Sequence, residues 1–334
     1  QQRVMTIFAA EGAAMLDVFL TVDVEIWCDG WLNIDEKFSH AFLKYIYGST
    51  PNGDYGLPYQ LDVLNDHGLK GVFFIEPLFS TRFGVQPLAE IVGLVKEKAQ
   101  EIQLHLHTEW VDEAREPLLP TVHAKRQHLR YFSKDEQTAL IGTGARLLNQ
   151  AGADNINAFR AGSCAFNRDT LGALAINGIP FDSSYNASHF GPDSGVMPGV
   201  TVVEPIECDG VYEYPMTVFK DGSRSLRHAQ LTACSYQELE GLLWQALESG
   251  RTSFVILSHG SELLNQDKIR ADEVVVKRFQ KLCSFLNHNR DSFRVRGFHG
   301  LEPQPARMQP DPLSSSLWKT GRRIIEQAYR WKYR

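Results

Sequence analysis

Two histidines and a glutamate alternate with leucine in the stretch EIQLHLHTEW, residues 101–110. Successive side chains of a β-strand point to opposite sides, so the leucines would face one layer while His105, His107 and Glu109 face the other. Imidazole and carboxylate ligands suit zinc and other first-row divalent ions. The stretch therefore predicts half of a metal site, the alternative being one structural histidine beside surface polar groups.

A second alternating stretch, LTVDVEIW at residues 20–27, puts two carboxylates on one face. Asp23 and Glu25 would share that face, while Val22 and Val24 face the core. Two carboxylates at the end of a core strand lose hydration energy unless a cation or hydrogen bonds compensate them. The pattern is compatible with a cation-binding strand end or with a solvated one.

Three further polar motifs stand at or near the ends of apolar segments: FRAGSCAFN (159–167), FDSSYNAS (181–188) and ILSHGSELL (256–264). In an α/β barrel the catalytic side chains gather at the carboxyl ends of the strands, because the following loops build the site there. Each motif is weak alone, but their common position favours one shared site.

The elements that must position these motifs read as alternating strands and helices. Seven apolar segments are expected to be strands: 17–27, 71–77, 101–107, 156–162, 210–219, 253–260 and 293–300. Between several of them apolar residues recur at spacings of three and four, and Gly152, Gly178 and Gly250 stand where helices should end. The pattern predicts an α/β fold with a parallel layer or barrel.

Composition excludes several classes of protein. The 334 residues are 43% hydrophobic and 22% charged, with a net charge of −6, which argues against a general nucleic-acid binder. Five scattered cysteines without a CxxC pair argue against a disulfide framework and favour a reducing compartment. We find neither a signal peptide nor an apolar run long enough for a membrane span, so we expect a cytoplasmic protein.

In this order the motifs resemble those of the polysaccharide deacetylase family, the NodB-homology domains of carbohydrate esterase family 4. TVDVE resembles the family's first motif, TFDDG; HLHTE its second, HxxxH; RAGSCAF its third, RxPYG; and LSHG its fifth, LxHG. The resemblance covers about residues 17–300. It implies a deformed (β/α) barrel of about seven strands and a metal-dependent deacetylase acting on an acetylated sugar of a polysaccharide or glycolipid precursor.

The resemblance also implies roles for single residues. Asp23 takes the position of the catalytic base, Arg160 that of the arginine that steadies the base, His259 that of the general acid, and His105 that of the first metal histidine. One divalent cation is implied, for which we expect zinc before cobalt, nickel or manganese.

Two metal positions depart from the family pattern. The family's metal aspartate is Val24 here, so we expect Glu25, one residue later on the face of Asp23, to replace it. The second metal histidine is Glu109, with His107 as the rival ligand. These departures leave open an inactive, carbohydrate-binding homologue, or an allantoinase-like hydrolase of a small C–N substrate.

Three more residues have expected roles at the site. The proline and tyrosine of the third motif are Gly162 and Cys164, so a backbone N–H near Cys164 would complete the oxyanion hole, while the thiol itself is expected to be packed rather than nucleophilic. Asp182 could hold His259 charged, or could merely form a turn. Trp110 is one of several aromatic residues near the motifs that could stack on sugar rings, with Trp27, Trp31, Tyr55 and Tyr59.

The composition changes after Leu301, which sets the expected domain boundaries. We expect a catalytic domain over residues 1–300, a Pro/Ser-rich linker over 301–316 and a basic amphipathic helix over 317–334. Six Lys/Arg residues in that helix, interleaved with Trp318, Tyr329 and Trp331, suit an anionic membrane surface or an acidic partner, the alternative being a solvated helix.

Overall fold

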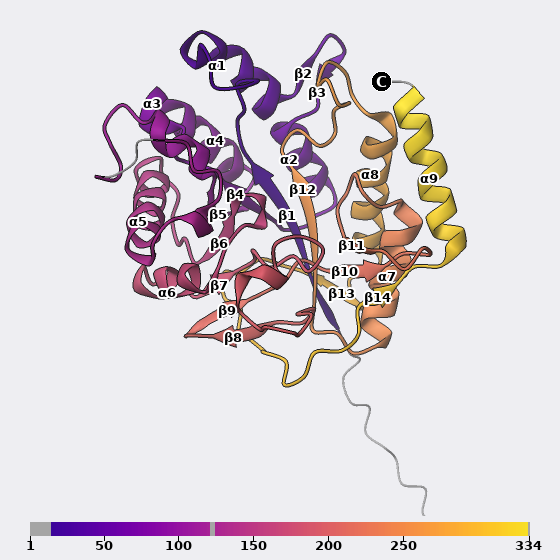
Figure 1. The fold of residues 1–334 in the computed structure, drawn as a ribbon. Coiled ribbons are helices and arrows are strands. Elements are labelled where there is room, and N and C mark those ends of the chain that lie inside the picture. The colour runs from indigo at the N-terminus through magenta and orange to yellow at the C-terminus, as the bar shows by residue number, and fades with distance from the viewer. Residues whose placement is uncertain (1–14, 121–123, 333–334) are drawn as a thin grey trace, which may run out of the picture.

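A curled sheet of nine strands runs through the protein in the computed structural model, which describes residues 15–120 and 124–332 (Figure 1). In spatial order the strands are β12 (Ser253–His259), β1 (Leu16–Val24), β4 (Gly71–Ile75), β5 (Glu101–Leu106), β6 (Ala158–Ala161), β7 (Phe181–Asp182), β9 (Val211–Glu213) and β8 (Ile206–Cys208), and β13 (Phe293–Val295) also pairs with β1. All pairings are parallel except that of β8 with β9. The predicted deformed (β/α) barrel is confirmed.

The central strand β1 explains the strongest sequence pattern. All nine of its residues are buried, as expected for a parallel strand covered on both faces. Its register with β12 aligns Asp23 with His259, and the register of β5 with β6 aligns His105 with Arg160. Strand pairing alone therefore brings four of the predicted site residues to one end of the sheet.

Helices flank the sheet, with α3 to α6 on one side of Figure 1 and α7 to α9 on the other. Their bounds are α1 (Ile34–Phe42), α2 (Leu57–Asp66), α3 (Ser80–Phe83), α4 (Val85–Glu97), α5 (Lys134–Gln150), α6 (Arg168–Ile176), α7 (Tyr236–Glu248), α8 (Glu273–His288) and α9 (Leu317–Lys332). Capping boxes start α5, α6 and α7. The glycines predicted to end these three helices follow them with positive φ, at Gly152, Gly178 and Gly250.

The strand prediction differs from the structure at several places. The segment 210–219 is two strands rather than one, because β9 belongs to the main sheet and β10 (Val218–Lys220) to another. Pro215, which cannot donate to a strand ladder, lies between them. The strands β7 and β8 were missed, since two or three residues are too few to show alternation.

Residues 301–316, where we expected a Pro/Ser-rich linker, contact the rest of the fold. They contribute β14 (Leu313–Ser314), which pairs with β10 in a three-stranded sheet that also contains β11 (Leu226–His228). The side chain of Gln309 accepts hydrogen bonds from the backbone N–H groups of Val203 and Glu204. The segment is therefore part of the domain, and it leads directly into α9.

A short hairpin of β2 (Ser49–Thr50) and β3 (Gly53–Asp54) lies in the excursion between α1 and α2. Over the described ranges, none of the helices has both the length and the apolar character that crossing a bilayer requires.

Candidate active site

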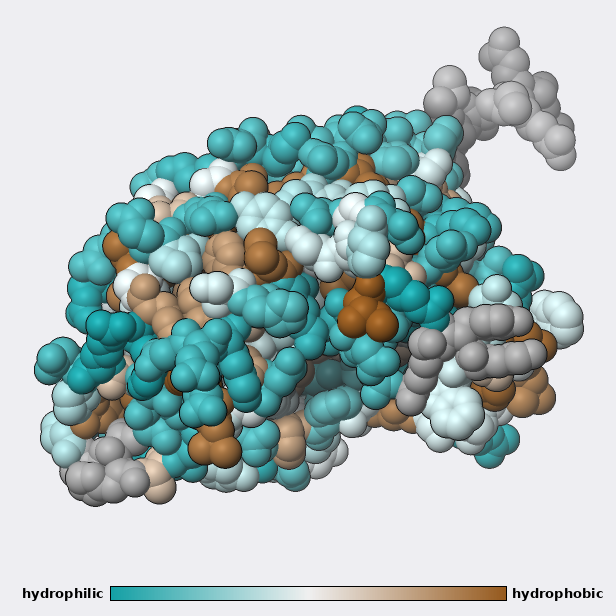
Figure 2. Space-filling view, turned by 90° about the horizontal axis from the view of Figure 1, so that it is seen from above, coloured by the Kyte–Doolittle hydropathy of each residue, from teal (hydrophilic) through white to brown (hydrophobic). Residues whose placement is uncertain are grey.

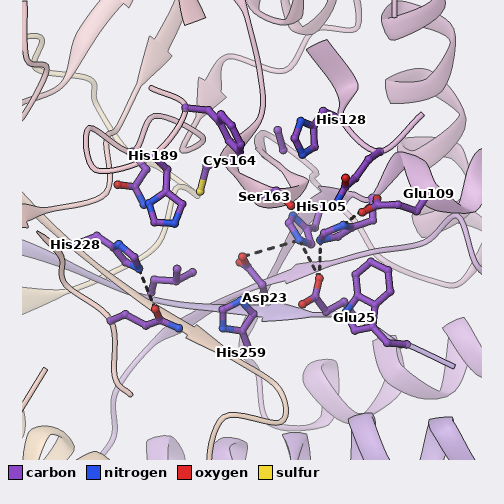
Figure 3. A pocket seen from close by; sticks show the side chains of 18 of the residues that line it. Asp23, Glu25, His105, Glu109, His128, Ser163, Cys164, His189, His228 and His259 are labelled. Atoms are coloured by element: carbon purple, nitrogen blue, oxygen red, sulfur yellow. Dashed lines mark hydrogen bonds and ion pairs between the residues drawn. The ribbon is translucent and has the colours of Figure 1, made fainter. Parts of the chain in front are cut away.

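A cavity of about 1010 Å³ opens at the carboxyl ends of β1, β5, β6 and β12. The surface is hollowed in the view from above (Figure 2), and imidazoles and carboxylates gather in the close view of the pocket (Figure 3). The predicted site residues that line the cavity are Asp23, Glu25, His105, His107, Glu109, Cys164 and His259. Arg160 lies directly behind Asp23 and is fully buried.

Glu25, His105 and His107 form a candidate metal centre, with one donor atom from each within 4.8 Å of the others. Oε2 of Glu25 lies 2.6 Å from Nε2 of His107 and 3.6 Å from Nε2 of His105. Despite this closeness, Oε2 has no partner in hydrogen-bond geometry among the described residues. A carboxylate and two imidazoles that converge in this way fit a first-row divalent cation.

Each of the two imidazoles is oriented through its other ring nitrogen. Nδ1 of His105 lies 2.8 Å from the backbone oxygen of Arg160, which can only accept, so Nδ1 donates this hydrogen bond and Nε2 faces Glu25. Nδ1 of His107 lies 3.2 Å from Oε2 of Glu109. Partners of this kind set the tautomer and direction of metal-binding histidines. Glu109 thus contacts the ring nitrogen of His107 that faces away from Glu25.

The charges within this centre are strongly coupled. Burial raises the pKa of Glu25, but the charge of His107 and the close approach of both imidazoles outweigh burial and hold that pKa well below its usual range. Burial lowers the pKa of His107, yet Glu25 and Glu109 raise it well above its usual range. A cation that binds here must displace the proton on His107, so binding should weaken as the pH falls.

Asp23 is fixed by Arg160 at the edge of the metal centre. Nη1 of Arg160 donates to Oδ1 of Asp23 at 2.7 Å and to Oγ1 of Thr21 at 2.9 Å. The guanidinium also donates to both oxygens of Ser183 and lies 4.3 Å from the ring centre of Phe74. Oδ2 of Asp23 is 3.9 Å from Nε2 of His105. One carboxylate oxygen is therefore held, and the other faces the candidate metal centre.

His259 is paired with Glu262, not with Asp182, which corrects our expectation. Nδ1 of His259 lies 2.9 Å from Oε2 of Glu262, whose other oxygen accepts from the N–H and the hydroxyl of Thr232. Burial lowers the pKa of His259, but the hydrogen bond and charge of Glu262 outweigh it and raise that pKa to about 9. His259 is therefore a protonated imidazole at neutral pH.

Asp182 belongs to a different, buried cluster and does not line the cavity. Its Oδ1 accepts from the hydroxyl of Ser184 at 2.6 Å, and its carboxyl group is hydrogen-bonded to that of Glu213. Burial raises the pKa of both carboxyl groups, and the charge of Asp182 raises that of Glu213 further. The pair thus retains a proton, and Asp182 packs behind the site instead of contacting the general-acid candidate.

The loop after β6 approaches the metal centre closely. A Cβ atom at Gly162 would lie 2.7 Å from Nδ1 of His107 and 2.7 Å from the backbone oxygen of Leu106, so no larger residue fits there. Ser163 and Cys164 follow with positive φ angles of 54° and 56° and line the cavity. Burial raises the pKa of the Cys164 thiol to about 12, and its Sγ packs 3.8 Å from Sδ of Met216. The thiol is protonated and packed.

Trp110 does not line the cavity, contrary to the expected substrate role. It is 1% exposed, and its indole packs edge-on against Trp31, Phe79 and Phe83. Trp27 and Trp31 do line the cavity, and the ring of Trp27 lies 4.7 Å from that of His107. Of the five aromatic candidates, Trp110 is therefore a packing residue, Trp27 and Trp31 are wall residues, and Tyr55 and Tyr59 line a different cavity.

Sequence reasoning missed many polar residues of the cavity wall, among them Lys125, His128, Asn186, His189, His228 and Gln230. Figure 3 shows His189 and His228 across the cavity from the candidate metal centre. Each is an isolated polar residue in a loop or at the end of a short strand, where spacing carries no signal. Glu262 could have been found, because it stands three residues after His259 within the motif ILSHGSELL.

The comparisons with known proteins rest on structure. No family model and no curated protein matches the chain. A candidate polysaccharide deacetylase from Mycobacterium smegmatis is similar in structure, with a TM-score of 0.54, 17% identity, and coverage of 93% of this chain and 99% of that one. The fold is that of a polysaccharide deacetylase.

The same fold also supports other carbohydrate chemistry. The 4-alpha-glucanotransferase from Thermococcus litoralis matches with a TM-score of 0.50 and 10% identity, over 86% of this chain and 40% of that one. The polysaccharide deacetylase fold therefore does not decide the reaction. That decision depends on the residues of the cavity.

Proposed function

We propose that the protein is a metal-dependent deacetylase that hydrolyses an N-acetyl group on a sugar. The observation that carries the proposal is the arrangement at the carboxyl ends of the strands. Three candidate metal-ligand atoms converge beside a carboxylate held by Arg160, and an imidazole held by Glu262 lines the same cavity. A base, a cation site and an acid in one open cavity are the requirements of amide hydrolysis.

Glu25, His105 and His107 would hold the cation, with Glu109 supporting His107. Zinc is the first choice, and cobalt, nickel or manganese would suit the same ligands. When bound, the cation would polarise the acetyl carbonyl and lower the pKa of a coordinated water. This assignment favours His107 over Glu109 as the third ligand, because the Glu109 carboxylate contacts the opposite ring nitrogen of His107.

The chain's own groups would move the protons. Asp23, oriented by Arg160, would take the proton of the attacking water. Backbone N–H groups of the Ser163–Cys164 turn would stabilise the negative oxygen of the tetrahedral intermediate. His259, protonated at neutral pH, would give its proton to the nitrogen as the C–N bond breaks, so acetate and a free amine leave.

The proposal is tested by measuring metal content and acetate release on the same proteins. Purified wild type, reconstituted with zinc, should hold about one ion per chain and release acetate from an N-acetylated chitooligosaccharide. Asp23→Asn should keep the ion but lose about 10²–10⁴-fold in kcat. His105→Ala should lose the ion as well, whereas His288→Ala, on the exposed surface of α8, should match wild type.

Different outcomes would favour the alternatives. A metal-free wild type that stays inactive after incubation with zinc, cobalt or nickel would favour an inactive carbohydrate-binding homologue. Turnover of a small amide without turnover of any sugar would favour the allantoinase-like hydrolase. Full activity in Asp23→Asn would reject the proposed mechanism.

A further inference from the structure

A second group of polar side chains lines the cavity, away from the candidate metal centre. Figure 3 shows His189 and His228 together on that side, and Gln230 lines the cavity with them. We call these three side chains the imidazole wall. His189 lies in the segment after β7, whereas His228 ends β11 and Gln230 forms a parallel bridge with Leu257 of β12. Leu257 stands two residues before His259, so the backbone fixes the wall beside the strand that carries the proposed acid.

The hydroxyl of Ser188 joins the two imidazoles of this wall. Its Oγ lies 3.0 Å from Nδ1 of His228 and 3.2 Å from Nδ1 of His189. The same hydroxyl donates to Oδ1 of Asn186 at 2.7 Å. Nε2 of His228 lies 2.9 Å from Oε1 of Gln230, so both ring nitrogens of His228 have partners. Both imidazoles are thereby oriented before any ligand enters.

Two polar groups of the imidazole wall remain available to a ligand. His189 is exposed, and over residues 15–120 and 124–332 its Nε2 has no hydrogen-bond partner. The amide nitrogen of Gln230 has none over the same ranges, because its contact with His228 uses the oxygen. Burial lowers the pKa of His228, and the hydrogen bond with Gln230 offsets this only in part. His228 is therefore neutral at pH 7 and adds no charge to the wall.

The aromatic ring of Phe190 adjoins the imidazole wall and also lines the cavity. The guanidinium of Arg130 lies 4.5 Å from the centre of that ring, and the centre of the His128 ring is 4.9 Å away. These contacts hold Phe190 in place. A pyranose has C–H groups on its face and hydroxyl groups along its edge, so it needs an apolar ring beside hydrogen-bonding groups. Phe190 and the imidazole wall supply that combination.

We propose that His189 and Gln230 bind hydroxyl groups of the sugar that carries the acetylated nitrogen. The ring of Phe190 lies against the face of this sugar. The direction of the substrate rests on the proposed function, in which the acetyl carbonyl meets the candidate metal centre and the nitrogen meets His259. Because Gln230 is paired with the strand of His259, the leaving sugar extends toward the imidazole wall. His189 and Gln230 are therefore specificity-determining residues of the proposed reaction.

Binding is measured on the zinc-loaded full chain carrying Asp23→Asn, which should hold a substrate without hydrolysing it. Titration calorimetry with N-acetylated chitotetraose gives the affinity. His189→Ala and Gln230→Ala should each weaken binding about fivefold, and together about 25-fold, because each removes one hydrogen bond. His189→Gln keeps a hydrogen-bonding group at this position and should recover part of the affinity. The control His40→Ala removes an exposed imidazole from α1 and should leave the affinity unchanged.

Kinetics separate a specificity role from a structural one. In the wild-type background, the His189→Ala/Gln230→Ala double variant should lose about tenfold or more in kcat/KM for chitotetraose. Its kcat/KM for 4-nitrophenyl acetate, which has an acetyl group and no sugar, should stay within about twofold of the wild-type value. The zinc content of the double variant should equal that of wild type.

Several results would overturn the proposal. They are unchanged affinity in the double variant, no binding of chitotetraose by the Asp23→Asn protein, and equal losses for both acetyl substrates. Binding that depends on His189 and Gln230, in a wild type that releases no acetate, would instead keep the subsite and reject the proposed function. If Gln230→Ala lowers the Tm, His189→Ala and His189→Gln decide, because His189 is exposed.

Discussion

At the scale of single residues, Glu262 sets the charge of the proposed acid. A histidine that donates a proton must be protonated in the reactive state, and an unperturbed imidazole is mostly neutral at pH 7. The carboxylate 2.9 Å from Nδ1 changes that balance for His259. Activity should therefore persist on the alkaline side until the pH rises through the raised pKa of about 9.

Glu262→Gln should move the alkaline limb of the kcat/KM–pH profile to lower pH by about 1–3 units, because loss of the opposite charge lowers the pKa of His259. The profile can be recorded by acetate release from a chitooligosaccharide between pH 5 and about 10. Asp182→Asn tests the expectation that Asp182 holds His259 charged. This substitution should leave the alkaline limb of the profile unchanged. An unmoved limb in Glu262→Gln would mean that His259 does not limit the rate at high pH.

The sequence predicted some residues of the candidate site correctly and misassigned the partner of another. Strict alternation located Glu25, His105 and His107 on one face, and the strand register then brought them together. The partner of His259 was misassigned, because β7, which carries Asp182, is five strand positions from β12. The correct partner lies on the turn that follows β12. His259 and Glu262 are only three residues apart in the sequence. The conformation of the turn, which the sequence does not show, directs the Glu262 carboxylate toward the His259 ring.

At the scale of elements, α9 is attached by ion pairs that are buried on the domain side, where Arg323 donates to Glu238 at 2.9 Å and to Asp221 at 2.8 Å. Burial raises the pKa of Asp221, but hydrogen bonds from Ser223 and Arg323 outweigh it and lower that pKa to about 2. Because the folded-state pKa lies below the usual value near 3.8, this contribution to stability is complete above about pH 4. It is lost as the pH falls toward 2.

Arg323→Met should destabilise the protein by about 3–5 kcal/mol, because Asp221 and Glu238 would remain buried without a cation. Urea unfolding at pH 7 measures the change, and limited trypsin digestion should release α9 earlier. Arg322→Met, on the solvent side of the same helix, should change the free energy of unfolding by about 0.5 kcal/mol or less. Equal effects of the two substitutions would contradict the buried attachment.

At the scale of the whole molecule, the cavity is larger than one sugar requires. Its volume of about 1010 Å³ is at the upper end of ligand pockets, which commonly span roughly 300–1000 Å³. Trp27 and Trp31 line one part of it, and His189 and His228 line another. Walls on both sides of the proposed metal centre suit a substrate that extends beyond the sugar carrying the acetyl group.

Activity should therefore rise with substrate length. The kcat/KM for an N-acetylated tetrasaccharide should exceed that for the monosaccharide by about tenfold or more, since remote contacts supply binding energy to the reacting centre. Acetate release from a series of one to five sugars measures this. Trp31→Ala should remove much of the gain for the longest substrates while changing the monosaccharide rate less. Equal rates across the series would point to a small-molecule substrate.

The long strands of the main sheet could be predicted from the sequence, whereas the short ones could not. Each of the seven predicted segments contains a strand of the main sheet, and the five longest of these strands, β1, β4, β5, β6 and β12, form one half of the sheet and hold the proposed chemistry. The other half is built from strands of two or three residues, whose pairing depends on contacts between distant segments. The pairing of Leu313–Ser314 in the second sheet could not be predicted for the same reason.

The register of β1 with β12 also constrains how the chain can be made. Asp17 pairs with Ser253, so one edge of the most buried strand waits for a partner that is synthesised 236 residues later (253 − 17). At about 5–20 residues per second, a ribosome needs roughly 10–50 s to produce that partner. Until then an apolar strand edge stays open to other nascent chains. Synthesis of this protein should therefore depend on chaperones that shield β1 during translation.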